Sequence, residues 1–296
     1  MLDQAYSRRQ FLGLAGGLAS IVGLGLVGCG GSGASDAADK GSAAAAESVS
    51  GEVTYDGASS FQALVEAAAE KFMYANPDVS VSGSGNGSGK GLTAVAAGTV
   101  TIGNSDVFAE TKLEADQVKN LVDHEVAVVG MGPVVSKNVT VDDLSLEQLK
   151  GIFSGQITNW KEVGGDDGEI VLVGREAGSG TRDGFESIVD VKDSCKYAQE
   201  LTATGAVISA VEANPLAIGY ASLSAVGDTV AMVTVEGVEC SENTVKDGTY
   251  KIQRPFVFVT NKSVALSEQA QAFVDFATSK DAADLIRTAG AVPVNE

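Results

Sequence analysis

Short apolar segments alternate with amphipathic helical segments along most of this chain, and that alternation limits the folds it can adopt. Residues 61–72 place apolar side chains at i, i+3, i+4, i+7 and i+11, which predicts a helix with one buried face. Short apolar runs at 79–81, 100–102 and 217–221 predict strands. Repeated strand–helix units favour an α/β fold with largely parallel sheets, because consecutive parallel strands need a crossover that a helix usually supplies.

Two strand-like segments, 125–129 and 255–259, lie far apart in the chain and match each other in apolar character. Such a pair suits two crossovers between two lobes, when the middle of the chain is inserted into the first lobe. We therefore expect lobe I to comprise 51–132 plus 256–296, and lobe II to comprise 133–255.

The segment 170–185, IVLVGREAGSGTRDGF, joins an apolar strand to a helix through a glycine-rich loop. Backbone N–H groups of Gly178 and Gly180 can converge on one point there. The polar and charged side chains of the loop are those of Arg175, Ser179, Thr181 and Arg182. Such a loop at a helix N-terminus suits a tetrahedral oxyanion. An ordinary strand-to-helix connection with a serine or threonine N-cap explains the same residues equally well.

Three further polar residues lie at helix starts or strand ends. Ser60 stands at the N-cap position of the helix that begins near Phe61, and capping is the commoner role of such a serine. Ser88 lies in the glycine run 83–91, at the start of another apolar helix. Asp106 follows the strand 100–102, where a carboxylate often caps the next turn.

The glycine run 83–91 resembles a nucleotide-binding P-loop but fails its pattern. Ser84 replaces the first glycine of that motif, and Gly91 replaces the hydroxyl residue that binds magnesium. The run is therefore better interpreted as a flexible loop at a helix N-terminus, with Ser88 as its side-chain donor.

The charge balance excludes one class of partner. The formal net charge is −19, whereas a nucleic-acid binder needs clustered lysine and arginine against the phosphate backbone. A small anion is still compatible, because neutral donors and one or two arginines act locally.

The sequence contains none of the residue patterns that would point to a common type of enzyme active site. The one histidine, His124, lies at a strand edge, and no G-x-S-x-G elbow accompanies it. The sequence has no histidine-rich or zinc-spaced cysteine cluster, and no pair of carboxylates stands out among its acids. We expect a binding protein without metal or cofactor rather than an enzyme.

The first 28 residues are interpreted as an export signal. Arg8 and Arg9 lie in a segment, 7–12, that resembles the twin-arginine motif, and an apolar stretch follows it. The stretch ends in LVGC, which resembles a lipobox with Cys29 as the lipidated residue; a plain N-terminal membrane anchor is the alternative. Residues 29–50 then form a flexible tether of small and polar residues. We expect an extracytoplasmic protein, anchored to the cell membrane by lipid.

Cys195 and Cys240 are the two remaining cysteines of the chain. An even pair in an oxidising compartment is compatible with a disulfide, and equally with two separate buried thiols. The residues leave both alternatives open.

Taken together and in this order, these motifs resemble those of the phosphate-binding lipoproteins of bacterial ABC-type phosphate uptake systems. The resemblance covers roughly residues 51–293. The segments that carry it are DGASSF at 56–61, the glycine run 83–91, IGNSD at 102–106, IFSGQITNW at 152–160 and REAGSGTR at 175–182.

The resemblance implies a periplasmic-binding-protein fold, in which two lobes close on inorganic phosphate. It implies a monomer that delivers phosphate to the permease subunits of an ABC transporter. It also implies eight phosphate-binding residues: Ser60, Phe61, Ser88, Asp106, Arg175, Ser179, Gly180 and Thr181. Ala177 departs from relatives that have an acid there to hold the arginine, so Arg175 needs another partner, and we expect Arg182 to lie outside the ligand contacts.

Two other functions share the same residues. One is an exported phosphoryl-transfer enzyme or phosphatase, which would need a nucleophile or metal that the sequence does not reveal. The other is a binder of sulfate, molybdate or a phosphonate. Asp106 argues against anions that carry no proton, because a dry carboxylate repels them unless they donate a hydrogen bond.

Overall fold

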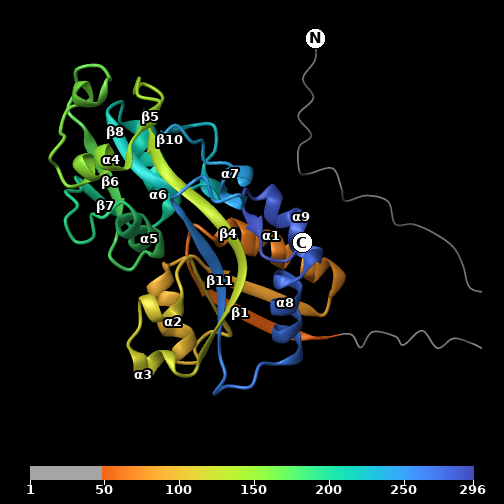
Figure 1. Ribbon diagram of the computed structural model, residues 1–296. Coiled ribbons are helices and arrows are strands. Elements are labelled where there is room, and N and C mark those ends of the chain that lie inside the picture. The colour runs from red at the N-terminus through yellow and green to blue at the C-terminus, as the bar shows by residue number, and fades with distance from the viewer. Residues whose placement is uncertain (1–48) are drawn as a thin grey trace, which may run out of the picture. The chain divides into compact units, whose positions relative to one another are not determined.

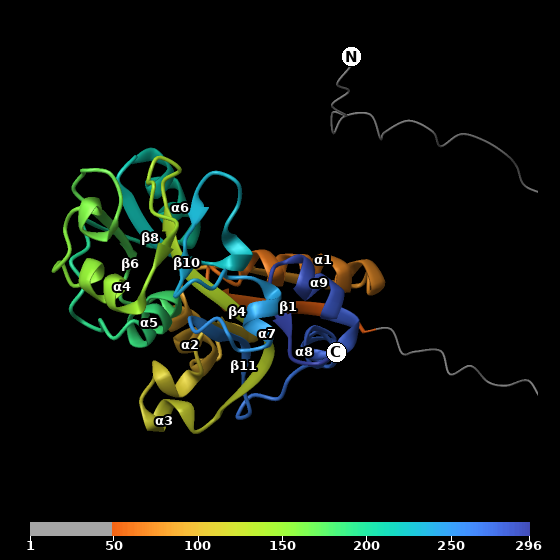
Figure 2. The ribbon, with the colours of Figure 1, turned by 45° about the horizontal axis from the view of Figure 1, so that its top comes forward.

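Two long strands, β4 (Leu121–Val135) and β11 (Gln253–Asn261), lie antiparallel at the centre of the computed structural model, which describes residues 49–296. Figures 1 and 2 show them side by side between two groups of elements. The pairing of the segments 125–129 and 255–259 is thus observed, and both strands are longer than predicted. The export signal, Cys29 and nearly all of the tether lie outside the described residues.

The elements that pack around β1 are called the β1 side. Here β1 pairs in parallel with β2 and β3, and β3 pairs antiparallel with β11. The strands are β1 (Gly51–Gly57), β2 (Val79–Ser84) and β3 (Ile102–Ser105). The helices are α1 (Gln62–Ala75), α2 (Ser88–Ala96), α3 (Ala115–Val118), α8 (Glu268–Thr278) and α9 (Ala283–Thr288).

The elements that pack around β6 are called the β6 side. There β6 pairs in parallel with β7 and β8, and β8 pairs antiparallel with β4. The main strands are β6 (Val171–Arg175), β7 (Gln199–Leu201) and β8 (Ala217–Ser222). The helices are α4 (Leu146–Phe153), α5 (Gly180–Ile188), α6 (Thr204–Ala213) and α7 (Glu242–Lys246).

Four short strands complete the described part. They are β5 (Asp143–Leu144), β9 (Ala231–Met232), β10 (Thr234–Val235) and β12 (Val292–Pro293). The main sheet has the order β2-β1-β3-β11-β4-β8-β6-β7. Its pairing is parallel within each side and antiparallel where β4 and β11 join the sides. The predicted α/β class is confirmed, as a mixed sheet flanked by helices.

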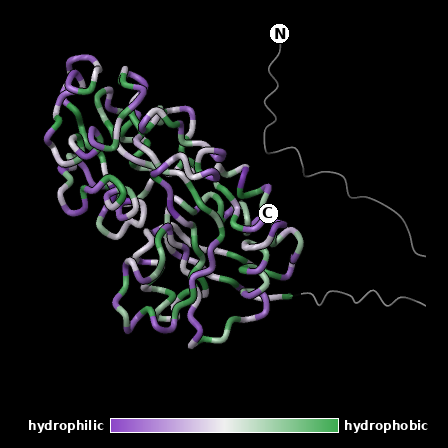
Figure 3. Tube along the Cα trace, in the orientation of Figure 1, coloured by the Kyte–Doolittle hydropathy of each residue, from purple (hydrophilic) through white to green (hydrophobic). Residues whose placement is uncertain are grey.

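Each side has its own apolar core. Figure 3 shows hydrophobic segments along the strands of both sides and hydrophilic ones at many turns. The predicted face of α1 is buried, and its Phe72 packs edge-to-face on Phe273 at 5.3 Å between ring centroids. On the β6 side Phe185 stacks on Tyr220 at 4.5 Å. Along β4, Val126 belongs to the first core and Met131 to the second, so one strand serves both.

Two boundaries differ from the sequence prediction in a way that matters for the site. The strand predicted at 100–102 is β3, which begins at Ile102, opposite Tyr55 of β1. Helix α2 begins at Ser88, inside the run predicted to be a flexible loop, because the N–H groups of Lys90 and Gly91 already donate to the Gly87 carbonyl. Ser88 therefore occupies the first turn of the helix. Within residues 49–296, no helix has the length and apolar character that a membrane span requires.

Candidate functional site

Asp106 directly follows β3 and is completely buried between the two sides. Its Oδ2 accepts hydrogen bonds from Ser60 Oγ (2.5 Å) and Thr181 Oγ1 (2.8 Å), and its Oδ1 accepts one from Ser88 Oγ (2.5 Å). Burial opposes ionisation of the carboxyl. The Arg254 guanidinium and the three hydroxyl donors outweigh that effect and hold the pKa of Asp106 below its usual value. At neutral pH, Asp106 is therefore an ionised acceptor.

The three hydroxyls reach Asp106 because three helices begin next to the end of β3. Ser60 precedes α1, Ser88 opens α2, and Thr181 lies in the first turn of α5 on the β6 side. The N-cap of α1 is Phe61, without a side-chain cap. The interpretation of Ser60 as an N-cap is therefore wrong: its hydroxyl turns to Asp106 instead. Helix starts carry free N–H groups and partial positive charge, so the region suits an anion.

Gly180 brings backbone against the carboxylate. A Cβ at this position would lie 2.1 Å from Asp106 Oδ1 and 2.5 Å from Ser88 Oγ, so no other residue fits without a shift. The neighbouring Ser179 is the N-cap of α5, and its hydroxyl accepts the Arg182 N–H at 3.2 Å. Phe61 is fully buried, and its N–H donates to the Ala58 carbonyl at 3.2 Å.

Arg175 ends β6 and is almost completely buried. Its Nη2 donates to Glu176 Oε1 (3.1 Å), and its Nη1 donates to Thr204 Oγ1 (2.9 Å). Its Nε also donates to the Leu201 carbonyl, and the second N–H of Nη2 donates to the Thr202 carbonyl. Glu176, next in the chain, thus does the orienting that Ala177 cannot. Among residues 49–296 these contacts engage four of the five guanidinium N–H groups and leave one on Nη1.

Arg254 is a buried cation that the sequence analysis missed. It lies on β11, is 4% exposed, and places Nη2 2.7 Å from Asp106 Oδ2 and 3.4 Å from Thr181 Oγ1. Its guanidinium also lies over the Phe256 ring, 5.6 Å from the centroid. The sequence did contain a signal for this residue: an arginine begins the apolar segment RPFVFV at 254–259. A charge in a buried strand needs a partner of opposite charge, so this arginine could have been matched with a buried acid.

Several further contacts join the β1 side to the β6 side around Asp106. Lys112 donates to the Ala177 carbonyl at 2.8 Å and forms an ion pair with Asp183. The Gly89 N–H of α2 donates to the Gly178 carbonyl at 3.0 Å. Figures 1 and 2 show α2 and α5 next to each other, in keeping with these bonds. The candidate site is thus enclosed by residues from both sides.

Arg182 lies outside the cluster around Asp106. It forms ion pairs with Glu186 (2.8 Å) and Glu200 (3.1 Å), and it donates to the Arg175 carbonyl at 2.8 Å. It therefore supports the strand end that carries Arg175.

The remaining predicted residues lie away from the site. Cys195 and Cys240 are free thiols, so the disulfide that the sequence left open is not formed in this structure. His124 forms a structural hydrogen bond with Thr260 Oγ1 at 2.8 Å.

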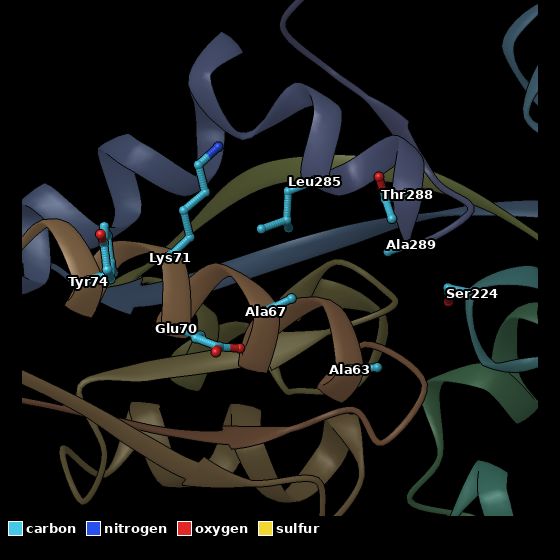
Figure 4. A pocket seen from close by; sticks show the side chains of 9 residues that line it. All are labelled: Ala63, Ala67, Glu70, Lys71, Tyr74, Ser224, Leu285, Thr288 and Ala289. Carbon is cyan, nitrogen blue, oxygen red and sulfur yellow. The ribbon is translucent and has the colours of Figure 1, made fainter. Parts of the chain in front are cut away.

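An open groove of about 680 Å³ lies elsewhere, between α1 and α9. Figure 4 shows its lining: Ala67 and Leu285 lie along the groove, with Glu70 and Lys71 on α1. Lys71 is already engaged with the Asp281 carbonyl at 2.8 Å. One charge of each sign over an apolar lining does not suit an oxyanion, so the cluster around Asp106 is the better candidate.

Comparisons with known proteins identify the family of the chain. A family model described as a PBP superfamily domain matches residues 42–281. The phosphate-binding protein PstS of Bacillus subtilis (strain 168) is 40% identical over 273 residues, which cover 90% of this chain and 89% of that protein. PstS of Staphylococcus aureus (strain bovine RF122) is 28% identical over 241 residues, covering 76% of this chain and 73% of that protein.

Solved structures give the same assignment. A phosphate ABC transporter substrate-binding protein from Clostridium perfringens, with bound phosphate, is 36% identical, with a TM-score of 0.76. The match covers 82% of this chain and all of that one. An ABC-type phosphate transport receptor from Vibrio cholerae is 30% identical, with a TM-score of 0.66 over 81% of this chain and 99% of that one. The chain therefore belongs to the PBP superfamily and, within it, to the PstS family of phosphate-binding proteins.

Proposed function

We propose that this protein captures inorganic phosphate between two lobes and delivers it to the permease of an ABC transporter. The observation that carries the proposal is the buried, ionised Asp106 amid hydroxyl and arginine donors. The names of the relatives, phosphate-binding protein and phosphate transport receptor, support the same function.

Selectivity follows from the acceptor character of Asp106. Hydrogen phosphate keeps a proton near neutral pH and can donate it to the carboxylate, whereas sulfate has none. Among the described residues, Oδ1 of Asp106 accepts a side-chain hydrogen bond from Ser88 alone. The other oxygen, Oδ2, accepts hydrogen bonds from the hydroxyls of Ser60 and Thr181 and pairs with the guanidinium of Arg254. A carboxylate oxygen has about two lone-pair sites, so Oδ1 is the oxygen that can receive the phosphate proton. Any side chain at position 180 would collide with this oxygen, so glycine is required beside it.

The remaining phosphate oxygens take donors from both sides of the molecule. We assign this role to the residues that the resemblance implies: Ser60, Phe61, Ser88, Arg175, Ser179, Gly180 and Thr181. The spare N–H of Arg175 supplies a charge-assisted hydrogen bond, and the free N–H groups at the start of α5 supply neutral ones. In this assignment the Phe61 N–H exchanges its bond to Ala58 for the ligand.

The two sides act as lobes with the boundaries expected from the sequence: 51–132 plus 256–296, and 133–255. Strand β4 crosses from one core to the other between Val126 and Met131, slightly before the expected boundary at 132. Strands β4 and β11 then serve as the two hinge segments, and phosphate binding draws the lobes together.

The relatives are substrate-binding proteins of transporters, which favours binding without catalysis. We further propose export by the signal in 1–28, lipid anchoring at Cys29 and action as a monomer outside the cytoplasm. The test is a thermal-shift series on protein stripped of phosphate, with phosphate, sulfate, molybdate and a phosphonate. Stabilisation by phosphate alone at micromolar concentration is expected. No shift with phosphate, together with a large shift from another anion, refutes the proposal.

A further inference from the structure

Arg254 is the one residue of the Asp106 cluster that comes from β11, the strand that joins the two sides. Its Nη2 bridges Asp106 Oδ2 of the β1 side and Thr181 Oγ1 of the β6 side. Among residues 49–296, its buried Nε has no hydrogen-bond partner, and the partner of Nη1 is the weakly accepting Met131 Sδ, at 2.7 Å. Arg254 therefore holds donor capacity that the described residues do not use, while its Nη2 lies at Asp106.

The charges around this cluster nearly cancel in pairs. Arg254 faces the charge of Asp106 after β3, the guanidinium of Arg175 at the end of β6 and the phenol of Tyr220 on β8. Arg175 in turn is paired with Glu176. Without Arg254 the core of the site would hold one cation and two carboxylates, a net charge of −1.

Resting on the proposed function, we propose that Arg254 selects the charge state of the ligand, so that the site takes dianionic hydrogen phosphate in preference to the dihydrogen monoanion. Its charge offsets the Asp106 carboxylate, which otherwise repels each negative charge on the ligand. One ligand proton then satisfies Asp106, and a second proton would face donors instead of an acceptor. Its unused N–H groups are matched to the additional charge of the dianion.

A preference for the dianion predicts the direction in which phosphate affinity changes with pH. The second ionisation of inorganic phosphate lies near pH 7, so the dianion fraction rises about tenfold between pH 6 and pH 8, and the affinity of the wild-type protein for total phosphate rises with it. In Arg254→Gln the extra charge of the dianion is no longer compensated. We expect about a hundredfold loss of affinity at pH 8, a smaller loss at pH 6, and a flat or inverted pH profile.

The number of protons released or taken up when phosphate binds is a second readout. A purely structural role of Arg254 would not change this number. At pH 7 roughly half of the phosphate is dianionic, so binding the dianion releases about half a proton, while binding the monoanion takes up about half a proton. Calorimetry in two buffers of different ionisation enthalpy measures that number. The wild type should release protons, and Arg254→Gln should release fewer or take them up.

Three further variants complete the experiment. Arg254→Lys keeps the charge and should keep the wild-type pH profile at reduced affinity. Asp106→Asn/Arg254→Gln removes both charges, so it tests the charge pairing even if Arg254→Gln alone fails to fold. Arg287→Gln removes an arginine of α9 that pairs with Glu242 of α7 and Asp284 of α9, and it should change neither readout.

Failure of the inference and failure of the proposed function are distinguishable. If wild-type protein does not bind phosphate at any pH from 6 to 8, the proposed function fails. If the wild type binds and Arg254→Gln keeps both the wild-type pH profile and its proton release, Arg254 does not select the charge state. Loss of the pH profile in Arg254→Lys as well, with the fold intact by thermal melting, also overturns the inference.

Discussion

Replacing Gly180 with alanine tests the geometry of the site at its tightest point. The added methyl group would lie 2.1 Å from Asp106 Oδ1 and 2.5 Å from Ser88 Oγ, far inside ordinary contact. Both atoms are fixed by buried hydrogen bonds, so neither yields without cost. The substitution therefore closes the carboxylate oxygen proposed to receive the phosphate proton.

Two opposing effects set the stability of Gly180→Ala. Alanine is favoured over glycine in a helix by roughly 0.5–1 kcal/mol, whereas overpacking a buried site costs about 1–3 kcal/mol. Overpacking wins, and we expect a net loss of about 1–2 kcal/mol in the free energy of unfolding. The blocked hydrogen bond to a charged acceptor is worth about 1.5–3 kcal/mol, which is a roughly 10- to 100-fold loss of phosphate affinity.

Gly178→Ala is the matched control in the same loop. A Cβ there meets nothing within 4 Å, and its φ is not in the left-handed region. Isothermal titration with phosphate and urea unfolding of both variants measure the two effects separately. We expect Gly178→Ala to stay within about threefold of wild-type affinity. If Gly180→Ala binds phosphate as tightly as Gly178→Ala, Oδ1 does not receive the ligand proton.

Three other perturbations follow from the contacts around Asp106. Lys112→Met removes the ion pair with Asp183 between the two sides, so stopped-flow measurements should show phosphate release about fivefold faster; an unchanged rate contradicts that role. Glu176→Gln loosens the grip on Arg175, and calorimetry should show about tenfold weaker binding, with wild-type affinity as the contrary result. The pKa of Asp106 is lowered in the folded protein, so its contribution to stability is present above its unfolded pKa, about 4, and is lost as the pH falls below that. Acid unfolding of Asp106→Asn should lack this component, and an identical acid transition would exclude it.

Local patterns predicted most of the fold. The 3.6-residue period at 61–72, the apolar start of 170–185 and the apolar run at 217–221 appear as α1, β6 and β8. These elements bury one face or both, which is why the period is visible in the sequence. The full length of β4 was not predictable in this way, because its second half continues through glycines and a proline that normally end a strand.

The sequence predicted most residues of the cluster around Asp106, but it predicted neither Arg254 nor the contacts that join the residues. Ser88, Asp106 and Thr181 stand at recognisable helix starts and strand ends, and the structure brings them together. Ser60 does not cap α1, because its hydroxyl donates to the buried Asp106 carboxylate instead. A hydrogen bond to an ionised acceptor is stronger than one between neutral groups such as a helix cap. Arg254 is 148 residues from Asp106 in the chain, and no local pattern joins them.

The most direct test of the account is the selectivity of Asp106→Asn for phosphate over sulfate. The wild type should prefer phosphate by about 10⁴-fold or more, because sulfate leaves the carboxylate without a donor. An asparagine amide can donate to either anion, so isothermal titration should show the preference reduced by at least about 100-fold, with sulfate binding improved. An unchanged ratio of the two affinities would contradict the role of Asp106 as the acceptor that selects a protonated anion.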